Sequence, residues 1–227
     1  MMWAAATVFA LLAPDDKAAE DAIAKFKSAA KSPDVSVRVE AVRQLGQTEH
    51  EKVLKVLASI LESEDKVVRI EAAKVLGAYQ DKKPKAVSVL AATLGSNSKE
   101  PEVEIAILLA LRDLRDKGAL GVAYRYLDDK NGKVAEAAIA ITEAIKSRDS
   151  VEPLIKLIKR LIGAGDGVTS GDGSFDAPPD PRLQERARLL DAAAQKALRA
   201  ITGESLSSPR EWESWWKRSG AGFRVKE

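Results

Sequence analysis

The chain of 227 residues is 45% hydrophobic, 31% charged and only 5% aromatic, a balance typical of a folded protein built from closely packed helices and unlike that of a β-sandwich. Its formal net charge of +2 is too small to attract nucleic acid to the molecule as a whole. The absence of cysteine excludes disulfides, zinc–thiolate sites and thiol nucleophiles, and the single histidine, His50, leaves little scope for imidazole chemistry.

The first 14 residues carry no charged side chain, and an apolar stretch runs from Met2 to Ala13. This stretch has the length of the apolar core of a signal peptide and is too short to span a membrane. A charged segment begins abruptly at Asp15. Residues 1–14 are therefore predicted to be a signal peptide, which implies an exported or periplasmic protein. The alternative is a hydrophobic helix that packs on the next segment of a cytoplasmic protein.

Residues 15–32 are predicted to form an amphipathic helix. Ala19, Ile23, Phe26 and Ala30 follow one another at spacings of 4, 3 and 4 residues, which places them on one helical face. Because a regular repeat pattern begins directly afterwards, we expect this helix to cap the open end of a stack.

Two segments of the chain repeat one another at a distance of 31 residues, Asp34–Gly46 and Asp65–Gly77. A period near 30 residues is typical of stacked helical pairs, because a single pair cannot bury its own apolar face. Two ladders of apolar residues extend the period along the chain. The first helices carry Leu45, Leu76, Leu111 and Ile141, and the second helices end on Leu61, Leu94, Leu127 and Leu161. We therefore predict an all-α fold, an α-solenoid, with four repeats in residues 33–161.

Local signals predict where the helices end and begin. Gly46 and Gly77 each stand just past a first helix, where a glycine in the left-handed conformation ends a helix at low cost. Thr48 and Glu51 have the spacing of a capping box, in which the two side chains satisfy amides at the start of the next helix.

Residues 162–181 interrupt the periodicity with five glycines and three prolines and are predicted to form a long loop. This loop has neither the Lys-Ser/Thr of a phosphate-binding P-loop nor the ligand spacing of an EF-hand, so we interpret it as a linker. Residues 182–227 then hold a displaced repeat helix, which Asp180 and Pro181 open and Gly203 closes, and a final helix that starts at a capping box of Ser208 and Glu211.

The final helix carries Trp212, Trp215 and Trp216, which share one helical face. A terminal repeat needs a cover for its exposed end, and tryptophan buries a large area. We predict that the three rings cover the end of the stack, with Trp215 or Trp216 partly exposed. The alternative is a docking patch for a partner.

The pattern Asp-x-x-Val-Arg-x-x-Ala-x-x-x-Leu-Gly at Asp34 and Asp65 resembles the short bacterial HEAT-like repeat, a class also found in phycobilin lyase subunits. The resemblance covers about 33–161. The Trp-rich helix after Gly203 resembles the C-terminal end of some bacterial HEAT-like proteins, several of them exported. The third and fourth repeats have Glu104 and Val134 where Arg38 and Arg69 stand, so the arginine ladder typical of HEAT proteins is interrupted. The resemblance implies a superhelix whose second helices line the concave side.

The second helices carry a row of cations that could bind an acidic peptide or polyanion. The predicted partner-binding residues are Lys55, Arg125, Lys156, Lys159, Trp215 and Trp216. The leading hypothesis is a non-catalytic scaffold that binds a protein or peptide, acidic in character, through the concave face. One alternative is an enzyme subunit of the HEAT-like class, lyase-like or glycosylase-like. Another is an assembly component that docks through its Trp-rich end.

Catalytic and metal-binding residues do not stand out in the sequence. His50 lies between Glu49 and Glu51, where we expect a solvated histidine at a helix start. One histidine cannot supply the repeated His-Glu pairs with which HEAT-like hydroxylases hold iron. We therefore expect no catalytic residue, no metal and no cofactor, and we find no strong signal for nucleic-acid binding or for a transmembrane segment.

Overall fold

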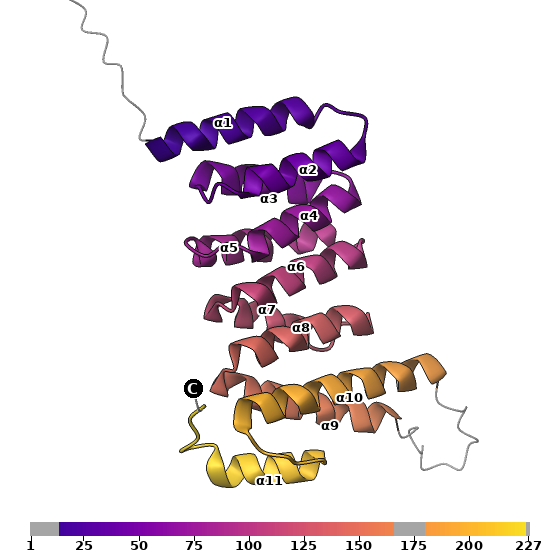
Figure 1. The fold of residues 1–227 in the computed structure, drawn as a ribbon. Helices are drawn as coiled ribbons and strands as arrows, with labels where there is room; N and C mark the ends of the chain where they lie inside the picture. The colour runs from indigo at the N-terminus through magenta and orange to yellow at the C-terminus, as the bar shows by residue number, and fades with distance from the viewer. Residues whose placement is uncertain (1–13, 166–179, 226–227) are drawn as a thin grey trace, which may run out of the picture.

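The computed structural model describes residues 14–165 and 180–225 of the chain (Figure 1). These residues form α-helices and short 3₁₀ helices and contain no β-strand, which confirms the all-α prediction. The α-helices are α1 (Pro14–Ala29), α2 (Val35–Gly46), α3 (Glu51–Ser63), α4 (Lys66–Gly77), α5 (Lys83–Thr93), α6 (Pro101–Leu114), α7 (Leu120–Tyr126), α8 (Gly132–Ile145), α9 (Val151–Gly165), α10 (Pro181–Thr202) and α11 (Pro209–Ser219). The 3₁₀ helices are η1 (Gly95–Asn97), η2 (Lys117–Ala119) and η3 (Arg148–Ser150).

The helices stack in the order of the sequence, which confirms the predicted α-solenoid (Figure 1). The first helices α2, α4, α6, α8 and α10 pack on one another in a continuous layer. The second helices α3, α5, α7 and α9 pack against this layer, α1 covers α2 at the amino-terminal end, and α11 packs on α9 at the other end. Each pair therefore contacts mainly its neighbours, as expected of a repeat protein.

The core follows both predicted ladders. The first-helix ladder Leu45, Leu76, Leu111 and Ile141 is at most 1% exposed, and the second-helix ladder Leu61, Leu94, Leu127 and Leu161 is at most 4% exposed. The buried residues form two clusters, one from α1 to α8 and one from α8 to α11. The 30-residue period of the sequence is thus the period of the buried surface.

Gly46 and Gly77 serve a different purpose from the predicted one. Each is the last residue of its helix, and neither has the left-handed backbone conformation that was expected. A Cβ atom at Gly46 would lie 2.1 Å from Cγ1 of Val75, and one at Gly77 would lie 2.8 Å from Cα of Ala110. The glycines therefore allow consecutive first helices to approach closely, and the prediction of left-handed helix ends is wrong.

The start of α3 also differs from the prediction. His50, and not Thr48, is the N-cap, and its Nδ1 accepts a hydrogen bond from the amide of Lys52 at 3.2 Å. The predicted capping box of Thr48 and Glu51 is wrong, because the chain turns for two more residues before the helix begins. Nε2 of His50 faces the carboxylate of Asp16 on α1 at 3.5 Å, so the ring joins α3 to the capping helix. The predicted capping box of Ser208 and Glu211 at α11 is present.

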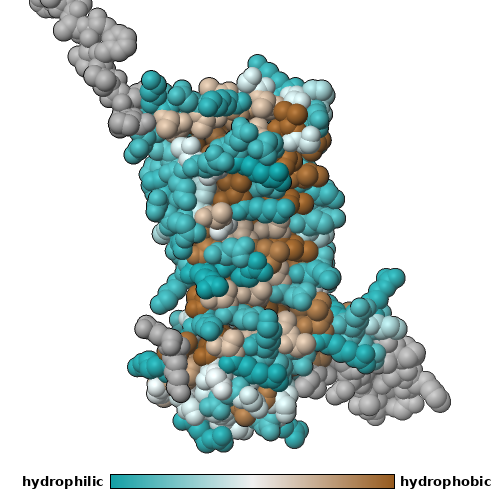
Figure 2. Space-filling view, viewed as in Figure 1, coloured by the Kyte–Doolittle hydropathy of each residue, from teal (hydrophilic) through white to brown (hydrophobic). Residues whose placement is uncertain are grey.

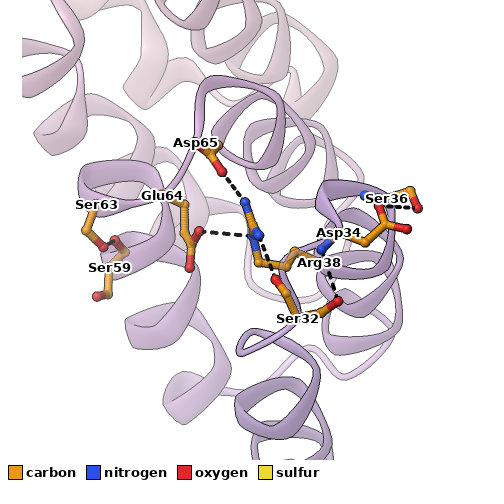
Figure 3. Close-up of polar contacts among 8 residues, drawn as sticks. All are labelled: Ser32, Asp34, Ser36, Arg38, Ser59, Ser63, Glu64 and Asp65. Atoms are coloured by element: carbon orange, nitrogen blue, oxygen red, sulfur yellow. Dashed lines mark hydrogen bonds and ion pairs between the residues drawn. The ribbon is translucent and has the colours of Figure 1, made fainter.

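Arg38 joins the first repeat to the second (Figure 3). Its Nη1 donates to the carbonyl of Ser32 at 2.7 Å, its Nη2 pairs with the carboxylate of Asp65 at the start of α4, and its Nε lies 3.6 Å from Glu64. The side chain is only 12% exposed. A largely buried arginine with three partners is a structural tie between repeats, not a group presented to a ligand.

Arg69 occupies the equivalent position in the second repeat. Its Nη1 donates to Oδ1 of Asn97 at 2.7 Å, and Nδ2 of the buried Asn97 donates to the carbonyls of Leu61 and Thr93 at 3.0 and 2.8 Å. The carboxylate of Glu49 makes a further tie, because it accepts from the amides of Gln80 and Asp81 before α5 at 2.8 and 2.9 Å. The third repeat has the buried Glu104 in place of the arginine, so this chain of ties ends there.

Two predicted segments lie partly or wholly outside the described residues. The signal-peptide prediction falls on residues 1–14, of which the structure describes only Pro14, as the first residue of α1. α9 continues to Gly165, so the first four residues of the predicted loop 162–181 are helical. Residues 166–179 are not described. α10 begins at Pro181 after the N-cap Asp180, and Gly203 closes it, as predicted. This glycine has the left-handed conformation (φ 76°).

The surface of the stack is mixed in polarity. Figure 2 shows bands of hydrophobic residues between rows of hydrophilic ones on the side seen in Figure 1. Among the described residues, the large hydrophobic side chains with the greatest exposure are Val37, Val67 and Leu183, which do not adjoin in the sequence. In the parts of the chain that the structure describes, none of the helices has the length and apolar character needed to cross a bilayer.

Candidate partner-binding groove

A groove with a volume of about 550 Å³ lies between α7 and α9. It exists because α7 packs on α8 while α9 packs on α10 and α11, so the two second helices stand apart. α7 is short, because the residues directly before it form the 3₁₀ helix η2 and not a further turn of α-helix. The lining residues are Tyr124, Arg125, Leu127, Asp128, Pro153, Lys156, Lys159 and Arg160.

The apolar part of the groove comes from both helices. Tyr124 and Pro153 are half-buried, and Leu127 is 3% exposed. The hydroxyl of Tyr124 lies 3.0 Å from Oγ of the buried Ser150, which fixes the ring against the wall. Burial raises the pKa of Tyr124, so the phenol is neutral at physiological pH. The groove thus presents a rigid aromatic side chain and a proline to any ligand.

Cations surround this apolar part because α9 is amphipathic. Its buried face contains Leu154, Leu157 and Ile158, and the opposite face exposes Lys156, Lys159 and Arg160. α7 adds the exposed Arg125. The rim therefore has four positive charges in a small area.

Three of these four cations have carboxylate partners. Nζ of Lys156 lies 2.7 Å from Glu152. Nζ of Lys159 lies 2.7 Å from Glu213 on α11, and this hydrogen bond lowers the pKa of Glu213. Nη1 of Arg160 lies 3.2 Å from Asp128. These pairs are solvent-exposed and therefore weak, so each can be exchanged for a ligand carboxylate.

Arg125 is different, because it forms no ion pair with any residue in the described part of the chain. Asp128, by contrast, is shared between Arg160 and Arg186, whose Nη2 lies 2.8 Å from its Oδ1. Arg186 also donates to the carbonyl of Asp129 and so fastens α10 to the turn between α7 and α8. One end of the groove is thus locked by a charge network, while Arg125 is available to a partner.

The structure brings three of the predicted site residues together and separates the others. Arg125, Lys156 and Lys159 all line the groove. Lys55 is exposed on α3, near the amino-terminal end of the stack, and does not line it. Arg160 belongs to the predicted row of cations on the second helices, but it was not among the predicted partner-binding residues. The sequence-based prediction missed Asp128 and Glu213, since no local pattern relates these acids to cations on another helix.

Trp215 and Trp216 lie at the end of the stack and not at the groove. Trp212 is fully buried, and its Nε1 donates to Oε1 of Gln195 on α10 at 2.7 Å. Trp215 packs edge-on against Trp212, with ring centroids 6.0 Å apart, and against Phe223 at 5.4 Å. Both Trp215 and Trp216 are half-buried. This arrangement agrees with a cover in which two of the three rings keep some exposure.

Arg148 holds Trp216 in this cover. The guanidinium lies 5.2 Å from the centre of the Trp216 ring, and its Nη2 donates to the carbonyl of Gly220 at 2.7 Å. Gly220 lies against the same ring, because an added Cβ would be 2.9 Å from Cδ2 of Trp216. The geometry favours the interpretation of the tryptophans as a structural end of the stack.

The described residues contain no group of three or more His, Cys, Asp or Glu side chains placed to hold a metal ion. The carboxyl of Glu104, which is 6% exposed, has its pKa raised by burial and by the nearby Asp129. Burial and the charge of Glu104 in turn raise the pKa of Tyr126, so the carboxyl lies near both Asp129 and Tyr126.

Residues 23–100 match the family model for HEAT repeats. The match spans the carboxyl-terminal part of α1 and the complete pairs α2–α3 and α4–α5, and it ends where α6 begins. A search of curated proteins gives no match to the chain. The helical pairs that match contain Arg38 and Arg69, and also Gly46 and Gly77, which allow first helices to approach closely.

Proposed function

We propose that this chain, whose first two helical pairs are HEAT repeats, is a non-catalytic scaffold that binds an acidic peptide segment of a partner protein in the groove between α7 and α9. HEAT repeats generally act as scaffolds for protein interactions, and the proposal adds a location and a ligand chemistry to that general role. The observation that carries it is the convergence of Arg125, Lys156 and Lys159 around one groove.

The groove suits a peptide with an apolar anchor and flanking carboxylates. Tyr124, Leu127 and Pro153 offer an apolar surface to the anchor, and an aromatic or aliphatic side chain there supplies affinity by losing contact with water. Arg125 offers a planar guanidinium for bidentate pairing with a carboxylate. The exposed pairs of Lys156 and Lys159 exchange their partners at little cost.

The test is a peptide array probed with the complete chain. Each peptide combines one Leu, Phe or Trp with flanking Asp or Glu, and a matched array has Lys in place of the acids. We expect the acidic array to bind and the double variant Arg125→Glu/Lys156→Glu to lose at least about tenfold in affinity, since two attractive charges become repulsive.

Lys55→Glu is the matched control, because it reverses a predicted site cation that lies outside the groove. If Lys55→Glu reduces binding as strongly as the double variant, the partner lies along the whole second-helix layer and the groove is not the site. If the double variant binds as well as the wild type while its circular dichroism is unchanged, the groove does not bind the peptide.

We further propose that the protein is exported, because residues 1–14 have the composition of a signal peptide. The intact mass of the protein purified from its own cells tests this. A mass that lacks the first 13 or so residues supports export. A mass that includes Met1 or Met2 contradicts it.

A further inference from the structure

A second pocket lies between the carboxyl-terminal ends of α6 and α8 and the side of α10. Its volume is about 470 Å³, and it shares no lining residue with the groove between α7 and α9. Two of its cations, Arg112 and Arg115, come from the end of α6, Lys146 follows α8, and Lys196 comes from α10. Three alanines and Glu143 complete the lining. Four cations from three helices thus face one carboxylate.

The positive charge of this pocket is only partly compensated. Lys196 pairs with Glu143 at 3.0 Å, and Arg112 pairs with its neighbour Asp113 at 2.7 Å. Neither Arg115 nor Lys146 forms an ion pair with another residue of the described ranges. Two exposed cations without an ion-pair partner in the described ranges therefore line this pocket.

Arg115 and Lys146 also have an unusual backbone. Their φ angles are 50° and 53°, and in the described residues they are the two non-glycine positions in the left-handed region. Glycine fills such positions at least cost, as Gly203 does at the end of α10. A cation after a helix is also favoured by the helix dipole, which accounts for each residue singly. It does not account for their convergence with Arg112 and Lys196 on one pocket.

We propose that this pocket binds a small polyanion, a compact molecule that carries two or more phosphate groups. Guanidinium and ammonium groups are the usual protein donors to phosphate oxygens. The alanines at 140, 144 and 200 leave room for a ligand between the cations, and the volume lies in the range of small-molecule sites. The site is separate from the peptide groove, so either proposal can fail without the other.

Inorganic pyrophosphate is the probe, titrated into the complete chain by isothermal calorimetry at low and at physiological salt. The key variant is Arg115→Gly/Lys146→Gly. Because glycine relieves the left-handed strain, the variant is expected to keep or raise the melting temperature while it removes both available cations. We expect the dissociation constant for pyrophosphate to rise by at least about tenfold.

Lys27→Ala/Lys99→Ala is the matched control, since it removes two exposed cations that do not line the pocket. It should bind pyrophosphate like the wild type. The proposal is overturned if the wild type shows no saturable binding, if the glycine variant binds as tightly, or if the control loses as much affinity. Citrate distinguishes phosphate from carboxylate recognition, and tighter binding of citrate than of pyrophosphate would overturn the assignment to phosphate.

Discussion

The two amino-terminal pairs, α2–α5, and the two pairs that follow, α6–α9, have the same architecture but use their charged residues differently. In the amino-terminal pairs the arginines Arg38 and Arg69 are tied into the next repeat, and glycine at 46 and 77 lets first helices touch. In the later pairs these positions have changed, and cations such as Arg125 and Lys146 have no ion-pair partner in the described part of the chain.

The segment that matches HEAT repeats contains Arg38, Arg69, Gly46 and Gly77, which hold neighbouring repeats together. The match to HEAT repeats ends at residue 100. The arginines that join neighbouring repeats and the glycines that let first helices approach closely all lie before this residue. Arg38 is largely buried among its internal partners, so its guanidinium is not presented to a ligand at the surface. Sites for partners are therefore expected where the consensus has lapsed, and both proposed sites lie there.

The largest expected effect concerns the end of the later region. Trp212→Ala removes a fully buried ring and leaves the buried Gln195 without its partner, so we expect a loss of about 3–5 kcal/mol of stability. Hydrogen exchange should increase in α9, α10 and α11 and change little in α2–α5. A uniform increase along the chain would contradict the view that each pair depends mainly on its neighbours.

Trp216→Ala tests the alternative that the tryptophans dock another chain. As part of the cover, the half-buried ring should lower the melting temperature by less than Trp212→Ala does, and the mass in solution by light scattering should not change. A change of oligomeric state with an unchanged melting temperature would instead support a docking end.

Glycine substitutions compare helix contacts in the two regions. Gly77→Ala places a methyl group 2.8 Å from the backbone of Ala110, so we expect a cost of about 1–3 kcal/mol. Gly121→Ala, in α7, meets no atom within 4 Å and should stabilise the protein by up to about 1 kcal/mol. Urea denaturation measures the free energy of unfolding of both variants, which should fall for Gly77→Ala and rise for Gly121→Ala. Equal effects would show that close approach is not what distinguishes Gly77.

Arginine substitutions compare tied and available cations. Arg38→Met leaves the Ser32 carbonyl and the Asp65 carboxylate without their donor and should cost about 1–2 kcal/mol. Arg125→Met should change stability by less than about 0.5 kcal/mol, since its guanidinium has no ion-pair partner in the residues described. Thermal melting of the two variants measures this contrast. A larger loss of stability for Arg125→Met than for Arg38→Met would contradict it.

The smallest effect concerns pH and Glu104, which stands in the register of Arg38 and Arg69. Burial raises its pKa above the ordinary value of 4.5, so the folded state holds the proton more tightly than the unfolded state. The associated stability is present below pH 4.5 and is lost as the pH rises through the raised pKa. Glu104→Gln should therefore gain stability over the wild type at pH 7 but not at pH 4, as read from paired melting curves. An advantage that is independent of pH would refute the ionisation argument.

The periodic part of the fold could be predicted from the sequence because the buried ladder repeats with the period of the chain. Leu45 and Leu76 reveal their helices by spacing alone. The function of Gly77 could not be predicted, since it depends on the approach of Ala110, 33 residues away. The two-residue difference between Thr48 and His50 as N-cap depends on where the turn closes, which local pattern resolves only to a few residues.

The candidate site was only partly predictable for a similar reason. Helical periodicity places Lys156 and Lys159 on the exposed face of one helix. It does not reveal that Glu213, 54 residues later, neutralises one of them. Arg115 and Lys146 occupy equivalent places in the structure, as the C-caps of α6 and α8. Their left-handed conformation and shared pocket could be recognised only in three dimensions.

The ties of the amino-terminal repeats all point the same way along the chain. Arg38 contacts Asp65, Arg69 contacts Asn97, and Glu49 contacts the amides of Gln80 and Asp81. Arg38 and Glu49 thus supply groups to the starts of α4 and α5, and Arg69 supplies a donor to Asn97 in η1. As the chain leaves the ribosome from its amino terminus, these three segments each meet an earlier helical pair that already holds a donor or acceptor for them. Synthesis and assembly can therefore proceed in the same direction, one helical pair at a time.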